Sequence, residues 1–323
     1  MNKPIPPKQY FGPFVPEHDL GIDRMHYIAL KSPDPKAAAE FAAENMGFFL
    51  VHVDEAGRHY LSGHGHDNYS LVYVPGDEAG LEHLSFVLFS SSDLERAATL
   101  LERQGVAVTR IENSDWWKRG PAVHFELPSG QRMELTLGVN TPAPMASIVA
   151  PPADAPAPIC ADHAILRVTD LEPNYEFVSR AMGLRESARI TNDAGAPILG
   201  FFRSHTLFHC FGFARSGYQG IHHIQFTLKN PLALYAAYEA MKEKGEVELL
   251  WGPLRHGAGH NMAFYFHDKD RHLIEYSVEE EIVLNDEAYV PRVWSAEDRR
   301  GSDEWEGTKP PWFGTTHVDP VIK

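Results

Sequence analysis

The chain repeats one short unit four times, and this repetition limits the folds open to it more than any other feature. Each unit begins with a strand-like segment that carries a histidine and continues into a helix-like segment that ends at a glycine. The histidine and glycine pairs are His26 and Gly47, His83 and Gly105, His163 and Gly183, and His223 and Gly245. Because the two residues of a pair are 20 to 22 positions apart in every unit, we interpret the chain as a duplicated supersecondary structure.

Each unit contains an amphipathic segment of helical length, with apolar residues near the i, i+3 and i+4 positions. We predict helices over 35–46, 93–104, 172–182 and 231–244. Asp34 and Ser92 are the expected N-caps of the first two helices, and the glycines suit left-handed C-caps. Short strand-like runs follow each helix. We therefore predict an α+β fold of four βαβββ modules, paired into two barrel-like domains with the helices outside.

A segment rich in alanine and proline separates the two halves of the chain. It carries prolines at positions 142, 144, 151, 152, 156 and 158 and shows almost no apolar periodicity, which is typical of a semi-extended linker. We predict an N-terminal arm, an N-terminal domain, a linker, a C-terminal domain and a C-terminal tail over 1–22, 23–140, 141–159, 160–285 and 286–323. The aromatic content of the tail indicates that it covers the site or an interface.

Composition argues against several classes of partner. The chain has 29 Lys and Arg against 44 Asp and Glu, a net charge of −15, so we expect no binding to nucleic acid. No apolar run reaches the ~18 residues of a membrane span, and the first residues contain no apolar signal core. Two cysteines, Cys160 and Cys210, do not provide a disulfide framework, so we expect a cytoplasmic protein.

Three residues on strand-like segments form a candidate metal site: His163, His223 and Glu275. Side chains alternate between the two faces of a strand, so a curved sheet can bring one residue from each of three strands into one cavity. Two neutral imidazoles and one carboxylate hold a divalent metal on one face and leave other positions open, which suits Fe(II), and Mn(II) accepts the same ligands. Each residue alone is more commonly structural, but as a set in phase with the repeats they favour a metal site. His222 competes with His223 for the ligand role, because adjacent strand residues face opposite ways.

The N-terminal half contains a second set of the same kind, His26, His83 and Glu134, at the equivalent places in the repeats. The residues that would support it differ, because Asp115 and His124 stand where the C-terminal half has a histidine and a tyrosine. We therefore expect the N-terminal domain to be catalytically silent. Whether its set of residues binds a metal stays open at this point.

The C-terminal half carries a long specific pattern, GPLRHGAGHNMAFYFHDKDRHLIEY over 252–276, preceded by the pair His222-His223. This pattern resembles the type I extradiol ring-cleaving dioxygenases, the catechol 2,3-dioxygenase-like members of the vicinal-oxygen-chelate (glyoxalase, bleomycin resistance protein and dioxygenase) superfamily. The resemblance covers about 23–285 as a fold and 160–280 as a site. In that family the metal ligand is the second of the two adjacent histidines, which is His223 here.

The resemblance implies cleavage of a catechol ring by O2 at Fe(II), beside the diol carbons, with a muconic semialdehyde-type product and a role in aromatic-compound degradation. It implies that His209, 14 residues before the second ligand, is the acid/base residue, with His205 as a competitor. Cys210 departs from the polar residue that many members have there. His256 and Tyr265 match residues that bind the substrate oxygen and help to deprotonate it. A homo-oligomer, either a dimer or a tetramer, is also expected.

Substrate choice is marked at a single position. Trp251 stands where homoprotocatechuate-cleaving relatives have an arginine on the substrate side, which favours an apolar or aryl-substituted catechol. Two alternatives stay open: a glyoxalase-like metal-dependent isomerase or transferase, and a non-catalytic ligand-binding protein of the same fold. The first usually lacks the pair His256 and Tyr265, and the second needs no metal triad.

Overall fold

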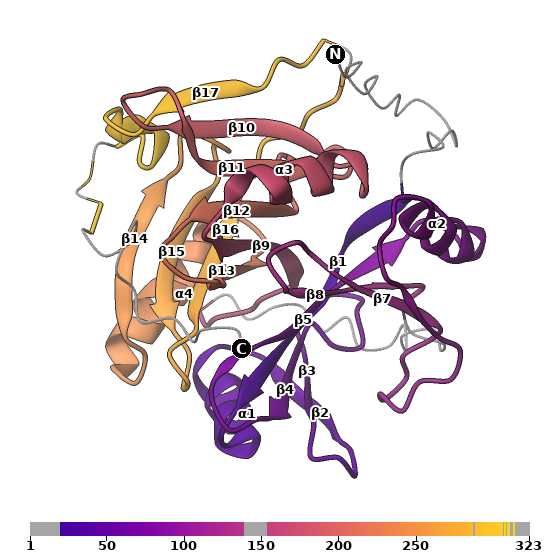
Figure 1. Ribbon diagram of the computed structural model, residues 1–323. Helices are drawn as coiled ribbons and strands as arrows, with labels where there is room; N and C mark the ends of the chain where they lie inside the picture. Colours follow the sequence, from indigo (N-terminus) through magenta and orange to yellow (C-terminus); the bar gives the residue numbers. More distant parts are fainter. Residues whose placement is uncertain are drawn as a thin grey trace.

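The computed structural model describes residues 20–138 and 154–313, apart from residues 287, 306, 308, 311 and 312. Within these residues it contains two mixed sheets of eight and nine strands, with α-helices on their outer sides (Figure 1). The predicted arm up to residue 19, the predicted linker up to residue 153 and the end of the tail from residue 314 lie outside the described residues.

The first sheet is built from the two modules of the N-terminal half. The first module consists of β1 (Ile22–Ser32), α1 (Pro35–Asn45), β2 (Phe49–Val53), β3 (His59–Ser62) and β4 (Leu71–Pro75). The second consists of β5 (Gly80–Leu88), α2 (Ser91–Arg103), β6 (Thr109–Ile111), β7 (Ala122–Glu126) and β8 (Arg132–Thr136). The strand order is β2-β3-β4-β1-β5-β8-β7-β6, and the first strands of the two modules, β1 and β5, pair antiparallel at its centre.

The second sheet repeats this plan and adds one strand from the tail. Its first module consists of β9 (Cys160–Val168), α3 (Leu171–Arg180), β10 (Arg185–Thr191), β11 (Pro197–Arg203) and β12 (Phe211–Arg215). Its second consists of β13 (Gly220–Thr227), α4 (Pro231–Lys244), β14 (Leu249–Arg255), β15 (Met262–His267) and β16 (Leu273–Val278). The tail contributes β17 (Arg292–Ser295), which pairs with β10, and the 3-10 turn η2 (Arg299–Gly301). The order is β14-β15-β16-β13-β9-β12-β11-β10-β17.

The predicted α+β fold of four βαβββ modules is therefore confirmed, and the helix ends lie close to the predicted ones. Asp34 caps α1 as expected, because its side chain accepts a hydrogen bond from the backbone nitrogen of Ala37 at 3.0 Å. The prediction of Ser92 as a cap is wrong: the N-cap of α2 is Ser90, which makes no side-chain capping bond. Gly245 caps α4 in the left-handed region, with φ of 71°.

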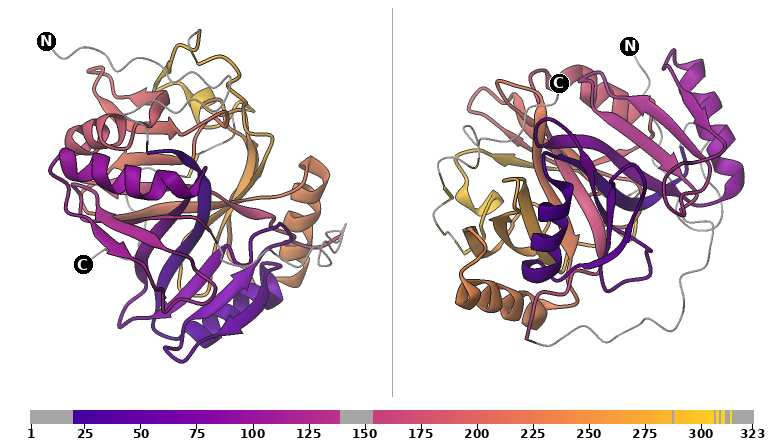
Figure 2. Two further views of the ribbon diagram at one scale, coloured as in Figure 1. Left: turned by 90° about the vertical axis from the view of Figure 1, so that its right-hand side faces the viewer. Right: turned by 90° about the horizontal axis from the view of Figure 1, so that it is seen from below.

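The two halves share one apolar core and contact each other directly. The ring of Phe48 packs edge-on against Phe226 with a centroid distance of 4.9 Å, and the hydroxyl of Tyr276 donates to the carbonyl of Met46 at 2.5 Å. Figure 2 shows the helices on the outside of this arrangement from two further directions. No helix in the described part of the chain is long and apolar enough to cross a membrane.

Two of the strands that position the site, β15 and β16, are buried along their whole length. Every residue of β15 and β16 is buried, including the charged Glu275 in the middle of β16. A charged side chain in such a place is costly unless it is paired, hydrogen-bonded or bound to a metal. The fold thus places a carboxylate where only specific partners can compensate for its burial.

Candidate active site

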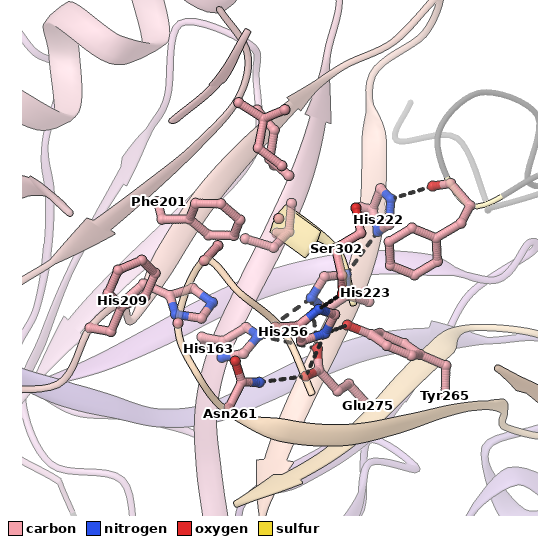
Figure 3. Close-up of a pocket in the computed structure, with 18 residues that line it drawn as sticks. His163, Phe201, His209, His222, His223, His256, Asn261, Tyr265, Glu275 and Ser302 are labelled. Carbon is pink, nitrogen blue, oxygen red and sulfur yellow. Dashed lines mark hydrogen bonds and ion pairs between the residues drawn. The ribbon is translucent and has the colours of Figure 1, made fainter. Parts of the chain in front are cut away.

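Three neighbouring strands carry the predicted metal ligands into one place: His163 comes from β9, His223 from β13 and Glu275 from β16. Strand β13 pairs with β9 on one side and with β16 on the other. The Nε2 atoms of the two histidines are 3.3 Å apart, and they lie 3.4 and 3.1 Å from Oε2 of the glutamate (Figure 3). All three side chains are buried, and their ligand atoms converge closely enough to hold one metal ion.

The protonation states of these residues also suit a metal. Burial, together with the neighbouring His209, lowers the pKa of His163 to about 4, so its imidazole is neutral at neutral pH. Burial alone would raise the pKa of Glu275, but the hydrogen bonds and charges of His163 and His223 outweigh it and hold that pKa well below its usual range. Neutral imidazoles and an ionised carboxylate are the forms that bind metals. The donor set therefore fits Fe(II) or Mn(II), which accept the same ligands.

His222, the predicted structural neighbour of the ligand, orients His223. Its Nε2 lies 2.8 Å from the carbonyl oxygen of Phe313, and its Nδ1 lies 2.8 Å from Nδ1 of His223. Since a carbonyl can only accept, His222 donates from Nε2 and accepts at Nδ1, so His223 donates from its own Nδ1. With a proton held at Nδ1, a neutral His223 can give up its Nε2 contact with Glu275 and offer that nitrogen's lone pair to a metal ion.

His209 precedes β12 and lies against His163, one of the candidate metal ligands. Its ring centroid is 3.8 Å from that of His163, and it lines the same pocket, whereas His205 is absent from the described lining. Oε1 of Glu280 lies 2.8 Å from the backbone nitrogen of His209 and 2.5 Å from its Nδ1. Because Oε1 accepts from both nitrogens, Nδ1 carries a proton and Nε2 is left as an acceptor. Burial lowers the pKa of His209 to about 3, so this imidazole is neutral at neutral pH.

His256 and Tyr265 form a hydrogen-bonded pair beside the ligands. Nδ1 of His256 lies 2.6 Å from the carbonyl oxygen of Ser302, so it donates there, and its Nε2 accepts from the Tyr265 hydroxyl at 2.8 Å. Burial, followed by the charge of Glu275, raises the pKa of Tyr265 well above its usual value, so this phenol stays protonated. The structure thus brings all six predicted site residues into one pocket.

Four further residues reach the site without having been predicted from the sequence. Asn261 donates from Nδ2 to Oε1 of Glu275 at 3.1 Å, and Glu280 holds His209. Ser302 and Phe313 belong to the tail and bring a backbone carbonyl to His256 and to His222. Asn261 lies inside the diagnostic pattern over 252–276 and could have been found there.

The N-terminal half corrects one prediction. His83 pairs with Ala29 on β1 as His223 pairs with Ile165 on β9, and two positions before these partners stand Tyr27 and His163. The residue equivalent to His163 is therefore Tyr27, and the placement of His26 at that position is wrong by one residue. Strand pairing supports the predicted equivalence of His124 with Tyr265 and of Glu134 with Glu275, since His124 faces Glu134 on β7 and β8 as Tyr265 faces Glu275 on β15 and β16.

Replacing Glu280 by glutamine should change the pH dependence of stability. Burial raises the pKa of Glu280 to about 8, against about 4.3 in an unfolded chain. The contribution of Glu280 to the free energy of unfolding is fully present below its pKa in the unfolded chain. It is lost as the pH rises through its pKa in the folded chain. The free energy of unfolding of Glu280→Gln, relative to the unaltered chain, should therefore increase from about pH 5 to about pH 8. Urea unfolding of the metal-free proteins measures this, and a difference that stays constant with pH would contradict it.

Two parts of the chain match known sequence families. Residues 161–276 match the Glyoxalase/Bleomycin resistance protein/Dioxygenase superfamily, and residues 81–136 match the Catechol 2,3-dioxygenase-like N-terminal domain. The manganese-dependent 2,3-dihydroxybiphenyl 1,2-dioxygenase of Geobacillus genomosp. 3 is 27% identical over 263 residues, which is 77% of this chain and 82% of that protein. Both halves of the chain are thus similar to extradiol ring-cleaving dioxygenases, and this similarity supports that activity. The metapyrocatechase of Pseudomonas sp. (strain CF600), 23% identical over 256 residues, covers 77% of this chain and 83% of its own length.

Solved structures share the fold of this chain. Homoprotocatechuate 2,3-dioxygenase from Arthrobacter globiformis superposes with a TM-score of 0.83 at 19% identity, covering 97% of both chains. The anaerobic substrate complex of the enzyme from Brevibacterium fuscum superposes with a TM-score of 0.79 at 20% identity, covering 90% of this chain and 91% of that one. The superfamily match over 161–276 contains every residue of the site from His163 to Glu275.

Proposed function

We propose that this protein is an extradiol dioxygenase that cleaves a catechol with an apolar or aryl substituent, using O2 at Fe(II) held by His163, His223 and Glu275. The observation that carries this proposal is the convergence of the three ligand atoms. It is supported by two candidate proton-handling groups in the same pocket, His209 and the pair of Tyr265 with His256. Mn(II) is the alternative ion, and a dependence on manganese is stated for the Geobacillus relative.

The pocket supports a substrate without a carboxylate. Its apolar lining comes largely from five side chains: Ile190, Leu199, Phe201, Phe208 and Phe313. Among the described residues that line it, none is an arginine or a lysine, so a substrate carboxylate would meet no cationic partner there. Trp251 does not belong to this lining; it lies behind Tyr265, with ring centroids 5.5 Å apart and planes at 17°. The proposed preference for an apolar catechol therefore rests on the side chains that line the pocket. Trp251 contributes only indirectly, by packing against Tyr265.

The bound metal would supply Lewis acidity and a common site for the catechol and O2. The Tyr265 hydroxyl would donate to a substrate oxygen, because its raised pKa keeps it protonated. In the substrate-free structure that single proton goes to Nε2 of His256, which Ser302 fixes, so the hydroxyl would turn from His256 to the substrate oxygen when the catechol binds. His209 would take a proton at Nε2 when the catechol binds and return it during ring cleavage, since Glu280 accepts from its Nδ1–H and so fixes the tautomer and the orientation of the ring.

The proposed product is a muconic semialdehyde-type compound with both oxygen atoms inserted, formed in the breakdown of aromatic compounds. We also propose a cytoplasmic homo-oligomer, a dimer or a tetramer, with domains at 23–140 and 160–285 joined by the linker 141–159. Both cysteines, Cys160 and Cys210, are free, which is consistent with a reducing compartment.

Anaerobic reconstitution with Fe(II) or Mn(II), followed by a catechol panel under oxygen, tests the function. We expect a yellow ring-fission product and about one O2 consumed per substrate, with 2,3-dihydroxybiphenyl and alkylcatechols turned over better than 3,4-dihydroxyphenylacetate. Metal binding without oxygen uptake across the panel would favour a glyoxalase-like isomerase or transferase, or a non-catalytic binding protein. Faster turnover of 3,4-dihydroxyphenylacetate than of the uncharged catechols would overturn the substrate class alone.

A further inference from the structure

The N-terminal half retains the framework of the metal site. Strands β1, β5 and β8 keep the register of β9, β13 and β16, because Ser85 faces Glu134 as Gln225 faces Glu275. Tyr27, His83 and Glu134 therefore stand where the C-terminal half has His163, His223 and Glu275. All three N-terminal side chains are buried, at 0%, 1% and 0% exposure.

In the N-terminal half, a cationic side chain of the protein contacts the carboxylate whose charge a metal ion would otherwise neutralise. Arg119 comes from the loop before β7, its side chain is 2% exposed, and its Nη1 contacts Oε2 of Glu134. The guanidinium also lies close enough to Tyr27 to hydrogen-bond with its hydroxyl. Asn261, in the corresponding loop before β15, contacts the other carboxylate with a neutral amide. Among the described residues, Glu275 is thus in contact with no arginine or lysine, whereas Glu134 is in contact with Arg119.

The N-terminal histidine, His83, is also held with a proton on the nitrogen that would bind a metal ion. The Tyr27 hydroxyl donates its proton to Oε1 of Glu134 at 2.7 Å, while its oxygen lies 2.8 Å from Nε2 of His83. That oxygen has no second proton to donate, so Nε2 of His83 carries the proton and donates it. Burial lowers the pKa of His83 to about 3, which keeps the ring neutral. The nitrogen equivalent to the ligand atom of His223 therefore has no lone pair to offer.

The remaining partners complete the neutralisation of Glu134. It accepts from the hydroxyl of Ser85 at 2.8 Å and interacts with Nε2 of His124 at 2.7 Å. Burial would raise the pKa of Glu134, but His124, His83 and Arg119 outweigh it and keep the carboxylate ionised. A buried ion pair with every oxygen engaged is a stable replacement for a carboxylate bound to a metal, whereas either partner left alone is costly.

We propose that Arg119 is a built-in substitute for a metal ion, and that Tyr27 and Arg119 together close a second metal site framed by His83 and Glu134. The chain consequently takes up one ion, in its C-terminal half. Returning a histidine to position 27 and removing the guanidinium opens a second site for a divalent ion of the kind that imidazole and carboxylate ligands bind. This inference concerns the N-terminal half and stands whether or not the C-terminal half cleaves catechols.

Metal content of the full-length chain tests the proposal. After equilibration with Co(II) and removal of free metal, the unaltered chain should hold about one ion and the Tyr27→His/Arg119→Ala variant about two. Adding Glu134→Gln to that variant should return the content to about one, because the carboxylate ligand is lost. Two ions in the unaltered chain, or a folded double variant that holds a single ion, would overturn the proposal.

Unfolding experiments keep the proposal testable if the double variant folds poorly. Arg119→Met leaves Glu134 as an uncompensated buried charge, so its urea midpoint should fall sharply, and adding Glu134→Gln should restore a substantial part of the loss. Arg119→Lys, which keeps a cation, should lie close to the unaltered chain. If Arg119→Met/Glu134→Gln is no more stable than Arg119→Met, the charge of Arg119 does not serve the carboxylate and the proposal fails.

Discussion

Replacing Glu275 by glutamine should leave the chain folded but nearly unable to retain metal, and ring cleavage should disappear with the metal. Glu275 is the only negative charge in the proposed donor set, and Nε2 of His163 and of His223 lie within 3.4 Å of its Oε2. Losing a hydrogen-bond partner of a ligand weakens metal binding about 10- to 100-fold, so losing the anionic ligand should cost more than about 100-fold. Metal analysis of the dialysed protein and oxygen uptake with a catechol measure the two effects.

Glu134→Gln is the matched control, because Glu134 occupies the same register position in the N-terminal half and is equally buried. It removes a buried carboxylate without removing a proposed ligand. We expect an unchanged metal content together with lower stability, since Arg119 loses its partner. A Glu275→Gln protein that kept a full complement of metal would contradict the ligand assignment.

The fourfold repeat was predictable because it depends on local patterns. Strand alternation, helical periodicity and glycine at helix ends act within one module, and each module repeats them. The convergence of His163, His223 and Glu275 followed from the same phasing, because residues at equivalent places on adjacent strands of one sheet lie side by side. What the phasing could not supply was the precise register of strands in the other half.

The error at His26 comes from residue type. The pairing of β1 with β5 shifts register between Met25 and Tyr27, and the pairing of β9 with β13 shifts at the matching place, between Ile224 and Phe226. The two halves therefore present the same strand position to the site, and that position carries His163 in one half and Tyr27 in the other. His26, one residue before Tyr27, has the residue type of a ligand, so the sequence alone favoured it.

Residues contributed from outside the strand pattern were also invisible in the sequence. Glu280 lies in the acidic run 279–281, which reads as a solvated turn, yet it is held against His209 in the interior. Ser302 and Phe313 contribute backbone carbonyls, whose positions depend on how the tail folds back and not on side-chain identity. Both of these residues line the pocket, which is consistent with the expectation that the tail covers the site.

Replacing His209 by asparagine should slow ring cleavage by about 100- to 10,000-fold, the usual contribution of a general acid or base. The metal content should not change, because His209 is not one of the three proposed ligands. Catechol affinity under anaerobic conditions should fall much less than turnover, because His256 and Tyr265 form a separate pair that would still hold the substrate. Single-turnover oxygen kinetics and anaerobic titration with a catechol measure the two quantities independently. Matched loss of metal and activity would assign His209 a structural role instead.

Two variants separate the role of His209 from that of its neighbours. His205→Asn is the matched control, because His205 was the competing sequence candidate and is absent from the described pocket lining; its turnover should equal that of the unaltered chain. Glu280→Gln should slow cleavage less than His209→Asn, since Glu280 acts only by fixing the Nδ1–H and the orientation of the ring. The double variant should be no slower than His209→Asn alone, because Glu280 has nothing left to position. Multiplicative losses in the double variant would show instead that Glu280 acts through a route other than His209.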